Sequence, residues 1–263
     1  MMRAVGIAIL ALITAAVVVI LYAPLAVVII GSVVPTKAAA FDWSAASFDA
    51  FAELAESGPI IRALMRSLFV STVAVLASLV LGTIFALYYH WSKSSLRQAL
   101  QLVIFLPFVL PQVITGLALL IATTVTPVPT GLVAVTIGHI LFVTAIAYRL
   151  ALMQLQALSS SLLEASLDLG ASQWQTVRLV LLPNMKGALT TAALLAFVLS
   201  FDETLITLFV VGDTPTLPIR LWAMIRVGFS PSINALVTII LAVSITIALF
   251  AIRRLDLTRL GHA

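Results

Sequence analysis

The 263-residue chain contains no cysteine, and charged residues make up only 9% of it. The first absence excludes disulfides, thiolate catalysis and cysteine-ligated metal sites. The second leaves too few ionic side chains for the surface of a soluble protein. Hydrophobic residues instead account for 62% of the chain, and its mean hydropathy is +1.22. A chain of 28.0 kDa cannot bury that much apolar surface internally, so we expect lipid to be its solvent.

Recognisable catalytic motifs are also missing. The chain has no HExxH, no GxSG-type nucleophile and no paired histidines, which removes the chemistry that an intramembrane enzyme needs. It has no GxxxxGK[ST] loop, so we expect no ATP hydrolysis by this chain itself. No basic patch is interleaved with stacking aromatics, so we expect no nucleic acid among its partners. The sequence predicts a non-catalytic protein that binds no cofactor and no metal itself.

Six apolar runs reach the length of about 20 residues that a membrane-spanning helix needs. They are Val5–Val33, Leu64–Tyr89, Leu100–Thr124, Gly131–Leu155, Gly187–Val211 and Ile233–Ile252. None shows the ten-residue alternation of a barrel strand. The sequence therefore predicts an all-α membrane protein, with residues 1–263 forming a single six-helix transmembrane domain. The first run is longer than the roughly 7–15 residues of a signal-peptide core, so we expect it to be retained.

The distribution of Lys and Arg predicts the orientation. With the N-terminus in the cytoplasm, the inner side holds nine of them: Arg3, Lys93, Arg97, Arg149, Arg178, Lys186, Arg253, Arg254 and Arg259. The outer side holds five: Lys37, Arg62, Arg66, Arg220 and Arg226. This excess favours both termini inside and explains the net charge of +4. Acidic residues gather instead in the first outer loop (Asp42, Asp49, Glu53 and Glu56), which we expect to form a surface helix.

Two prolines, Pro107 and Pro111, interrupt the third run, and Gly116 follows them. Proline removes a backbone donor and kinks a helix. One interpretation is simple shaping of the helix, which a bundle tolerates. The other is that the third helix bends where it lines a substrate path.

The polar interval between the fourth and fifth runs, residues 156–183, predicts two short helices. Ser161 with Glu164, and Ser172 with Gln175, match the capping-box pattern. Gly170 suits the left-handed position that ends a helix. With Pro183 expected to close the second helix, we predict helices near Leu162–Leu169 and Gln173–Leu182.

This interval resembles a family signature. Glu164-Ala165-Ser166, then Gly170, then Val180-x-Leu182-Pro183 is similar to the E-A-A-x3-G-x9-I-x-L-P motif of ATP-binding-cassette importer permeases. Ser166 replaces the second alanine and Val180 the isoleucine, and neither change threatens the helix-turn-helix geometry. By this resemblance, the interval is the coupling segment of a type I importer permease. Its candidate docking residues are Glu164, Ala165, Ser166, Asp168, Gly170 and Ala171, with Leu182 and Pro183 fixing the exit into the fifth span.

The resemblance covers nearly the whole chain and extends to the spermidine/putrescine-type subfamily, where the chain looks most similar to the second permease. The residues that carry it are Leu199-Ser200-Phe201-Asp202-Glu203, Leu217-Pro218 and Val227-Gly228-x-Ser230-Pro231-x-x-Asn234-Ala235. It implies a multi-pass protein of the bacterial inner (plasma) membrane, surrounded by lipid. It also implies three kinds of protein partner: a dimer of cytoplasmic subunits that bind ATP and Mg²⁺, a second homologous permease, and a periplasmic or extracellular substrate-binding protein.

Asp202 and Glu203 are the costliest residues to place in a membrane. At 1.5 Å per residue they lie about 24 Å along a helix from Lys186, in the outer half of the bilayer, and a carboxylate near a helix centre costs about 2.5–3.5 kcal/mol. They either bind a cationic substrate or serve as a structural ion pair, with Arg220 or Arg226 as partner, or as a helix cap. The candidate substrate path comprises Asp202, Glu203, Phe201, Pro107, Pro111 and Trp222. His139, alone in the fourth run, is expected to bond to another helix.

The leading interpretation is a permease subunit that forms half of a translocation path for a polyamine or a related small organic solute. Similar permeases serve other organic solutes, so a different substrate is one alternative. A self-sufficient secondary transporter is another, although the chain shows no convincing internal repeat, which the usual secondary-transporter architecture contains.

Overall fold

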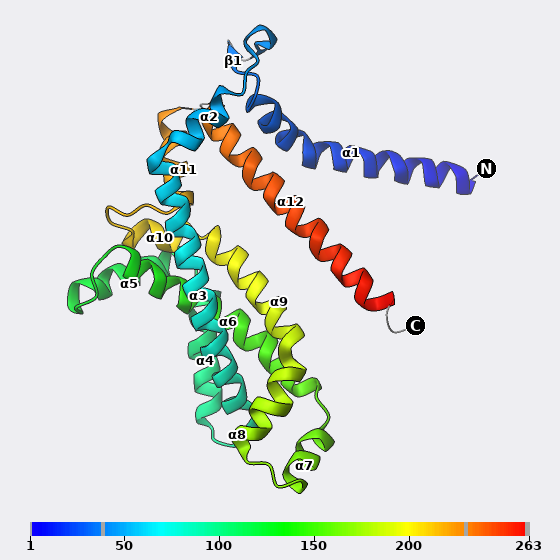
Figure 1. Ribbon diagram of the computed structural model, residues 1–263, viewed down its shortest axis with the longest axis vertical. Helices are drawn as coiled ribbons and strands as arrows, with labels where there is room; N and C mark the ends of the chain where they lie inside the picture. Colours follow the sequence, from blue (N-terminus) through cyan, green and yellow to red (C-terminus); the bar gives the residue numbers. More distant parts are fainter. Residues whose placement is uncertain (1, 38–39, 229–230, 261–263) are drawn as a thin grey trace. The chain divides into compact units, whose positions relative to one another are not determined.

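The computed structural model describes residues 2–37, 40–228 and 231–260 (Figure 1), which form two compact units. Unit 1 contains residues up to 61 and those from 221 on, and unit 2 contains Arg62–Arg220. The helices of unit 2 are α4 (Leu96–Val109), α5 (Gln112–Val125), α6 (Leu132–Ala157), α7 (Ser160–Asp168), α8 (Gln173–Thr176), the π-helical turn η2 (Val177–Leu181), α9 (Leu182–Phe201) and α10 (Leu205–Val210). Helix α3 (Gly58–Trp91) and helix α11 (Leu217–Val227) each have residues in both units.

Unit 1 consists mainly of two long helices, α1 (Met2–Gly31) and α12 (Pro231–Leu260). Between α1 and α3 lie the strands β1 (Thr36–Lys37) and β2 (Ala40–Phe41), the 3₁₀ turn η1 (Trp43–Ala45) and helix α2 (Asp49–Glu56). The predicted acidic surface helix is confirmed as α2 for Asp49, Glu53 and Glu56, whereas Asp42 caps η1 instead. Helix α2 buries Ala50 and Leu54 and leaves Glu53 exposed. The Ser232 hydroxyl donates to the Glu53 carboxylate over 2.9 Å, and the Asn234 amide donates to the Gly31 carbonyl over 3.1 Å. These bonds join α12 to both earlier helices.

Four helices of the described residues are long and apolar enough to cross a membrane: Ile9–Gly31, Gly58–Trp91, Leu132–Ala157 and Gln173–Phe201. A fifth span results if the bent pair of α4 and α5 is counted as one. The sixth predicted span, Ile233–Ile252, falls within α12, where a shorter apolar stretch covers Pro231–Thr246. The all-helical architecture is confirmed, whereas the count of six spans and the orientation remain predictions.

Helix α6 forms the centre of unit 2. In α6, 56% of the most apolar stretch is buried. The corresponding share is 33% in α3 and 22% in the helix that ends at Phe201. Small residues allow the neighbouring helices to approach it closely. A Cβ atom on Gly82 of α3 would lie 2.6 Å from the Tyr148 backbone nitrogen, and one on Gly138 would lie 2.7 Å from the Ile206 side chain. Larger residues at these two positions would force the helices apart.

The third predicted span is two helices that meet at 106°. Pro107 lies inside α4 without ending it, and the break comes at Leu110, which is extended (φ −66°, ψ 147°) before Pro111. Proline disfavours the α conformation in the residue before it, which explains why the chain turns there. Helix α5 then packs against α10: a Cβ atom on Gly116 would lie 2.8 Å from the Phe209 ring.

The fifth predicted span, Gly187–Val211, was expected as one helix, and this is wrong. Helix α9 ends at Phe201, and α10 begins at Leu205. The three residues between them include Asp202 and Glu203. The free N–H groups at the start of α10 need acceptors inside the bundle. The Glu203 side chain provides them, as described below.

Candidate functional site

The coupling segment, residues 156–183, lies at one end of unit 2. Figure 1 shows α7 and α8 at the same end as the connection between α3 and α4. Leu163 of α7 packs against a buried cluster that includes Tyr148, Leu155 and Leu181. The segment is therefore anchored to the rest of unit 2 through side chains.

The start of α7 differs from the prediction. Its N-cap is Ser159, whose hydroxyl accepts a hydrogen bond from the Ser161 backbone N–H at 3.3 Å, and the two hydroxyls lie 2.6 Å apart. The predicted capping box of Ser161 with Glu164 is wrong because the extended residue before the helix comes two positions earlier, which places Ser161 within the first turn. The Glu164 side chain is exposed.

The end of α7 is a Schellman motif centred on Gly170. The Gly170 N–H donates to the Leu167 carbonyl at 2.9 Å, and the Ala171 N–H donates to the Ser166 carbonyl at 3.1 Å. Gly170 has φ of +78°, a conformation that costs glycine little and other residues more. The predicted glycine stop is confirmed.

The second helix begins as predicted and ends elsewhere. Ser172 and Gln175 form a full capping box: the Ser172 hydroxyl accepts from the Gln175 N–H at 3.3 Å, and the Gln175 side chain accepts from the Ser172 N–H at 2.7 Å. Pro183 does not close this helix. The chain passes through the π-helical turn into α9, with Pro183 in the first turn of α9.

The wider π turn explains why proline is tolerated here. An α-helical turn would bring the proline ring against the carbonyl four residues earlier, whereas a π turn opens that space. The Asn184 side chain donates to the Val180 carbonyl at 2.7 Å and satisfies one acceptor of this irregular turn. Residues 173–201 therefore form one continuous helix that connects the coupling segment directly to a membrane span.

A buried hydrogen bond locks α7 onto α8. The Ser166 hydroxyl lies 2.8 Å from the Thr176 hydroxyl, and both side chains are buried. Ser166 therefore faces inward, while Glu164, Ala165, Asp168 and Gly170 are exposed and Ala171 is half-buried. Large apolar side chains of the same segment are exposed as well: Leu162, Leu167, Leu169, Trp174 and Leu179. The segment presents a firmly held surface of mixed apolar and acidic character.

The second candidate region is the break between α9 and α10. The Glu203 carboxylate accepts from the Ile206 N–H at 2.6 Å, the Thr207 N–H at 3.0 Å and the Thr207 hydroxyl at 2.9 Å. It also lies 3.3 Å from Nε2 of His139, which is buried with it. Glu203 thus caps α10. Of the alternatives left open for this residue, the helix cap is therefore the one found, and in the described residues no salt bridge joins its carboxylate to Arg220 or Arg226.

His139 connects three helices, as expected for an interhelical hydrogen-bond partner. Its Nδ1 lies 2.8 Å from the Ser200 hydroxyl on α9, and its Nε2 lies 2.8 Å from the Thr207 hydroxyl on α10. This network holds the break in a fixed geometry. The sequence did not predict Ser200 and Thr207 as partners of His139. The spacing of Thr207, one helical turn after Glu203, was the available signal.

Asp202 differs from its neighbour. Its side chain is exposed, and in the described residues no hydrogen bond or ion pair holds its carboxylate. Phe201 beside it is half-buried and stacks on Phe197, with ring centroids 5.8 Å apart. Phe201, Asp202 and Glu203 therefore lie together at one helix break.

The other candidate path residues lie on separate elements. Pro107 is half-buried within α4, and Pro111 is exposed at the start of α5. Trp222 belongs to unit 1, where the Arg226 guanidinium lies 5.6 Å from its ring centroid. Among the described residues, no group of three or more His, Asp or Glu side chains that could hold a metal ion occurs.

The chain belongs to the family of binding-protein-dependent transport system inner membrane components, whose model matches residues 78–258. It is thus a multi-pass inner-membrane permease component, and the family is a non-catalytic component of its transport systems. It is 32% identical to the putrescine transport system permease protein PotI of Escherichia coli (strain K12) over 84% of this chain and 81% of that protein. It is 25% identical to the spermidine/putrescine transport system permease protein PotC of Haemophilus influenzae, over 80% of this chain and 82% of that one.

Two solved structures share the fold. One is a bacterial ABC transporter involved in the import of alginate, which matches with a TM-score of 0.75 at 18% identity over 96% of this chain and 95% of that one. The other is the MetNI methionine ABC transporter, with a TM-score of 0.63 at 19% identity over 74% of this chain and 94% of that one. Both likenesses confirm the all-α permease fold.

Proposed function

We propose that this chain forms half of the translocation path of an ATP-driven importer of polyamines, and that residues 156–183 transmit movement from an ATP-binding partner. The observation that carries the proposal is the construction of the coupling segment. The Schellman motif, the capping box and the Ser166–Thr176 bond make it stiff, and the helix from 173 to 201 continues it into the membrane. A push on the segment therefore reaches the break at Asp202 through one helix.

The partners follow from the same reasoning. The chain has no nucleotide-binding loop, so the dimer of ATP-binding subunits is a separate component, which also holds the ATP and Mg²⁺. A second permease completes the path, and an external binding protein delivers the solute. Glu164, Ala165, Asp168, Gly170 and Ala171 form the docking surface. Ser166 supports that surface from inside, and Leu182 and Pro183 carry the chain into the membrane.

The polyamine substrate is proposed from the relatives and from the geometry of Asp202. A free carboxylate beside two stacked aromatic rings suits an organic cation, which gains from the charge and from the ring faces. Glu203 is engaged in capping α10, so Asp202 is the carboxylate that meets the substrate. Phe201 supplies an aromatic face along the path, and Pro107 and Pro111 shape it. Trp222, on unit 1, stays a candidate from the sequence alone.

Gly170→Arg tests the coupling role. Arginine disfavours φ of +78° and adds a charged chain to the docking surface, so the variant is expected to insert normally but to lose co-purification with the ATP-binding subunit and to lose uptake. Gly170→Asn is the matched control, because asparagine tolerates the left-handed conformation and adds no charge to the docking surface. Wild-type uptake by Gly170→Arg would overturn the proposal.

A further inference from the structure

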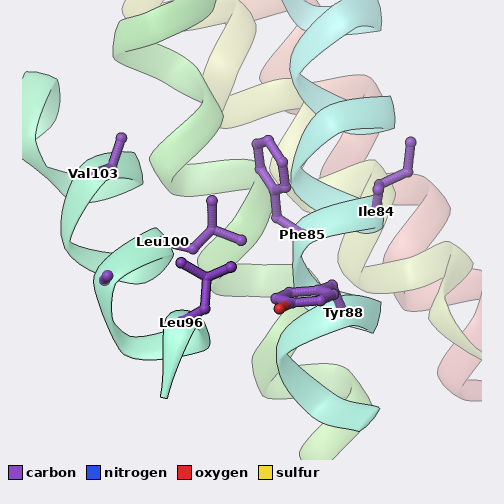
Figure 2. A pocket seen from close by; sticks show the side chains of 7 residues that line it. Ile84, Phe85, Tyr88, Leu96, Leu100 and Val103 are labelled. Carbon is purple, nitrogen blue, oxygen red and sulfur yellow. The ribbon is translucent and has the colours of Figure 1, made fainter. Parts of the chain in front are cut away.

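An apolar groove lies between α3 and α4, at the end of unit 2 that carries the coupling segment. Its volume is about 490 Å³, and it is lined by Ile84, Phe85, Tyr88, Leu96, Ala99, Leu100 and Val103. Figure 2 shows Leu96 and Leu100 between the two helices on the side of Phe85, with the Tyr88 ring reaching from α3 toward Leu96. No other described element of unit 2 fills this space.

The lining selects the kind of occupant. A pocket for a polar solute needs a few placed polar groups to orient its ligand, and the Tyr88 hydroxyl is the single polar side-chain group in this lining. Leu96, Val103 and Ile84 are more than half exposed, so the groove opens toward the surroundings of the helices. Within a membrane those surroundings are lipid. The groove therefore suits a hydrocarbon chain.

Two basic residues lie close in sequence to the residues that line the groove. Lys93 lies in the connection between α3 and α4, and Arg97 lies in the first turn of α4. Trp91, the last residue of α3, is exposed. The Arg97 guanidinium is held 5.3 Å from the Tyr89 ring centroid, and it donates to the Ser92 carbonyl at 3.0 Å.

These charges lack acidic neighbours in sequence: residues 57–163 contain no Asp or Glu. In the described part of the chain, no salt bridge involves Lys93 or Arg97. Basic residues beside an interhelical pocket on the cytoplasmic side are the usual receptors of anionic lipid headgroups. An apolar groove with basic residues nearby matches a molecule that has a hydrocarbon chain and an anionic headgroup.

We propose that this groove binds an anionic diacyl phospholipid of the cytoplasmic leaflet. One acyl chain lies between α3 and α4, and the phosphate meets Lys93 and Arg97. The assignment to the cytoplasmic leaflet rests on the proposed function, in which the coupling segment at the same end of unit 2 faces the cytoplasmic ATP-binding subunit. The lipid secures the α3–α4 connection to the membrane surface beside that segment.

Native mass spectrometry of the purified full-length chain, titrated with dioleoyl phosphatidylglycerol or dioleoyl phosphatidylcholine, tests the proposal. The wild type is expected to retain phosphatidylglycerol preferentially. Lys93→Gln is expected to weaken that retention about fivefold, the effect of one surface charge. Ala99→Trp fills the groove and is expected to abolish retention, whereas Leu102→Trp, an exposed position of α4 outside the lining, is expected to preserve it. Equal retention of both lipids, or of phosphatidylglycerol by all variants, would overturn the proposal.

A photo-crosslinking residue at Leu96 in the assembled transporter identifies the occupant in the membrane. An adduct with the mass of an anionic phospholipid supports the proposal, and an adduct with the second permease instead overturns it. Gly170→Arg serves as a further control. It is expected to lose the ATP-binding subunit yet retain the lipid, so the lipid proposal and the coupling proposal fail separately.

Discussion

Ser166 shows how one side chain can replace another without loss of geometry. The family signature has alanine at this position, and a buried serine needs a hydrogen-bond partner. Thr176, ten residues later on α8, provides it at 2.8 Å. The pattern around Ser166 predicted the helix but not the partner, because the contact depends on how α7 folds back onto α8.

Removing one hydroxyl of this pair leaves the other buried and unpaired. We expect Ser166→Ala to destabilise the segment by about 1–3 kcal/mol, and Ser166→Ala with Thr176→Val to recover most of that loss, because both polar groups are then gone. Limited proteolysis of the segment in inverted membrane vesicles measures the effect. Additive losses in the double variant would contradict the pairing.

Gly170 makes a second prediction at this scale. Gly170→Asn is expected to keep the Schellman motif, because asparagine tolerates the left-handed conformation, whereas Gly170→Val is expected to disrupt it. Binding of the ATP-binding subunit to vesicles carrying each variant is the measurement. Equal binding by the two variants would show that backbone conformation at this position is unimportant.

At the scale of elements, the break between α9 and α10 assigns different tasks to two adjacent carboxylates. Glu203 is buried and satisfies the first N–H groups of α10, while Asp202 is exposed beside stacked aromatic rings. Sequence alone left both tasks open for both residues, because two adjacent carboxylates carry no sign of which one caps the helix that follows.

Substitutions of the two carboxylates are therefore expected to have different effects. Glu203→Ala leaves two N–H groups without acceptors where water is scarce, which costs at least the roughly 0.5–2 kcal/mol of a lost cap. Glu203→Gln keeps one acceptor oxygen and is expected to cost less. Thermal unfolding in detergent measures both.

Asp202→Asn is expected to leave stability unchanged and to raise the KM for polyamine uptake about tenfold or more, since a charged contact to the cation is lost. Uptake of labelled putrescine by cells carrying each variant makes the comparison. The assignment is reversed if Asp202→Asn unfolds the protein and Glu203→Ala changes only the KM.

At the scale of the whole molecule, a permease subunit and a self-sufficient transporter predict different behaviour in isolation. Proteoliposomes containing this chain alone are expected to show no flux of putrescine along its gradient, because the chain supplies half of a path and no energy source. Addition of the ATP-binding subunit, the second permease and the binding protein is expected to restore uptake that depends on ATP. Flux by the chain alone would favour the secondary transporter.

Sequence by itself determined the membrane class, the helical fold, the acidic surface helix and the glycine stop in the coupling segment. These depend on hydropathy over about 20 residues and on capping patterns within four, both of which are local. The tertiary structure decided where the long runs break and which polar side chains are buried. The third run turns by 106° at Pro111, and the fifth ends at Phe201. Proline marks the first break locally, whereas the Gly116 and Gly138 contacts and the His139–Glu203 network join helices that are distant in sequence.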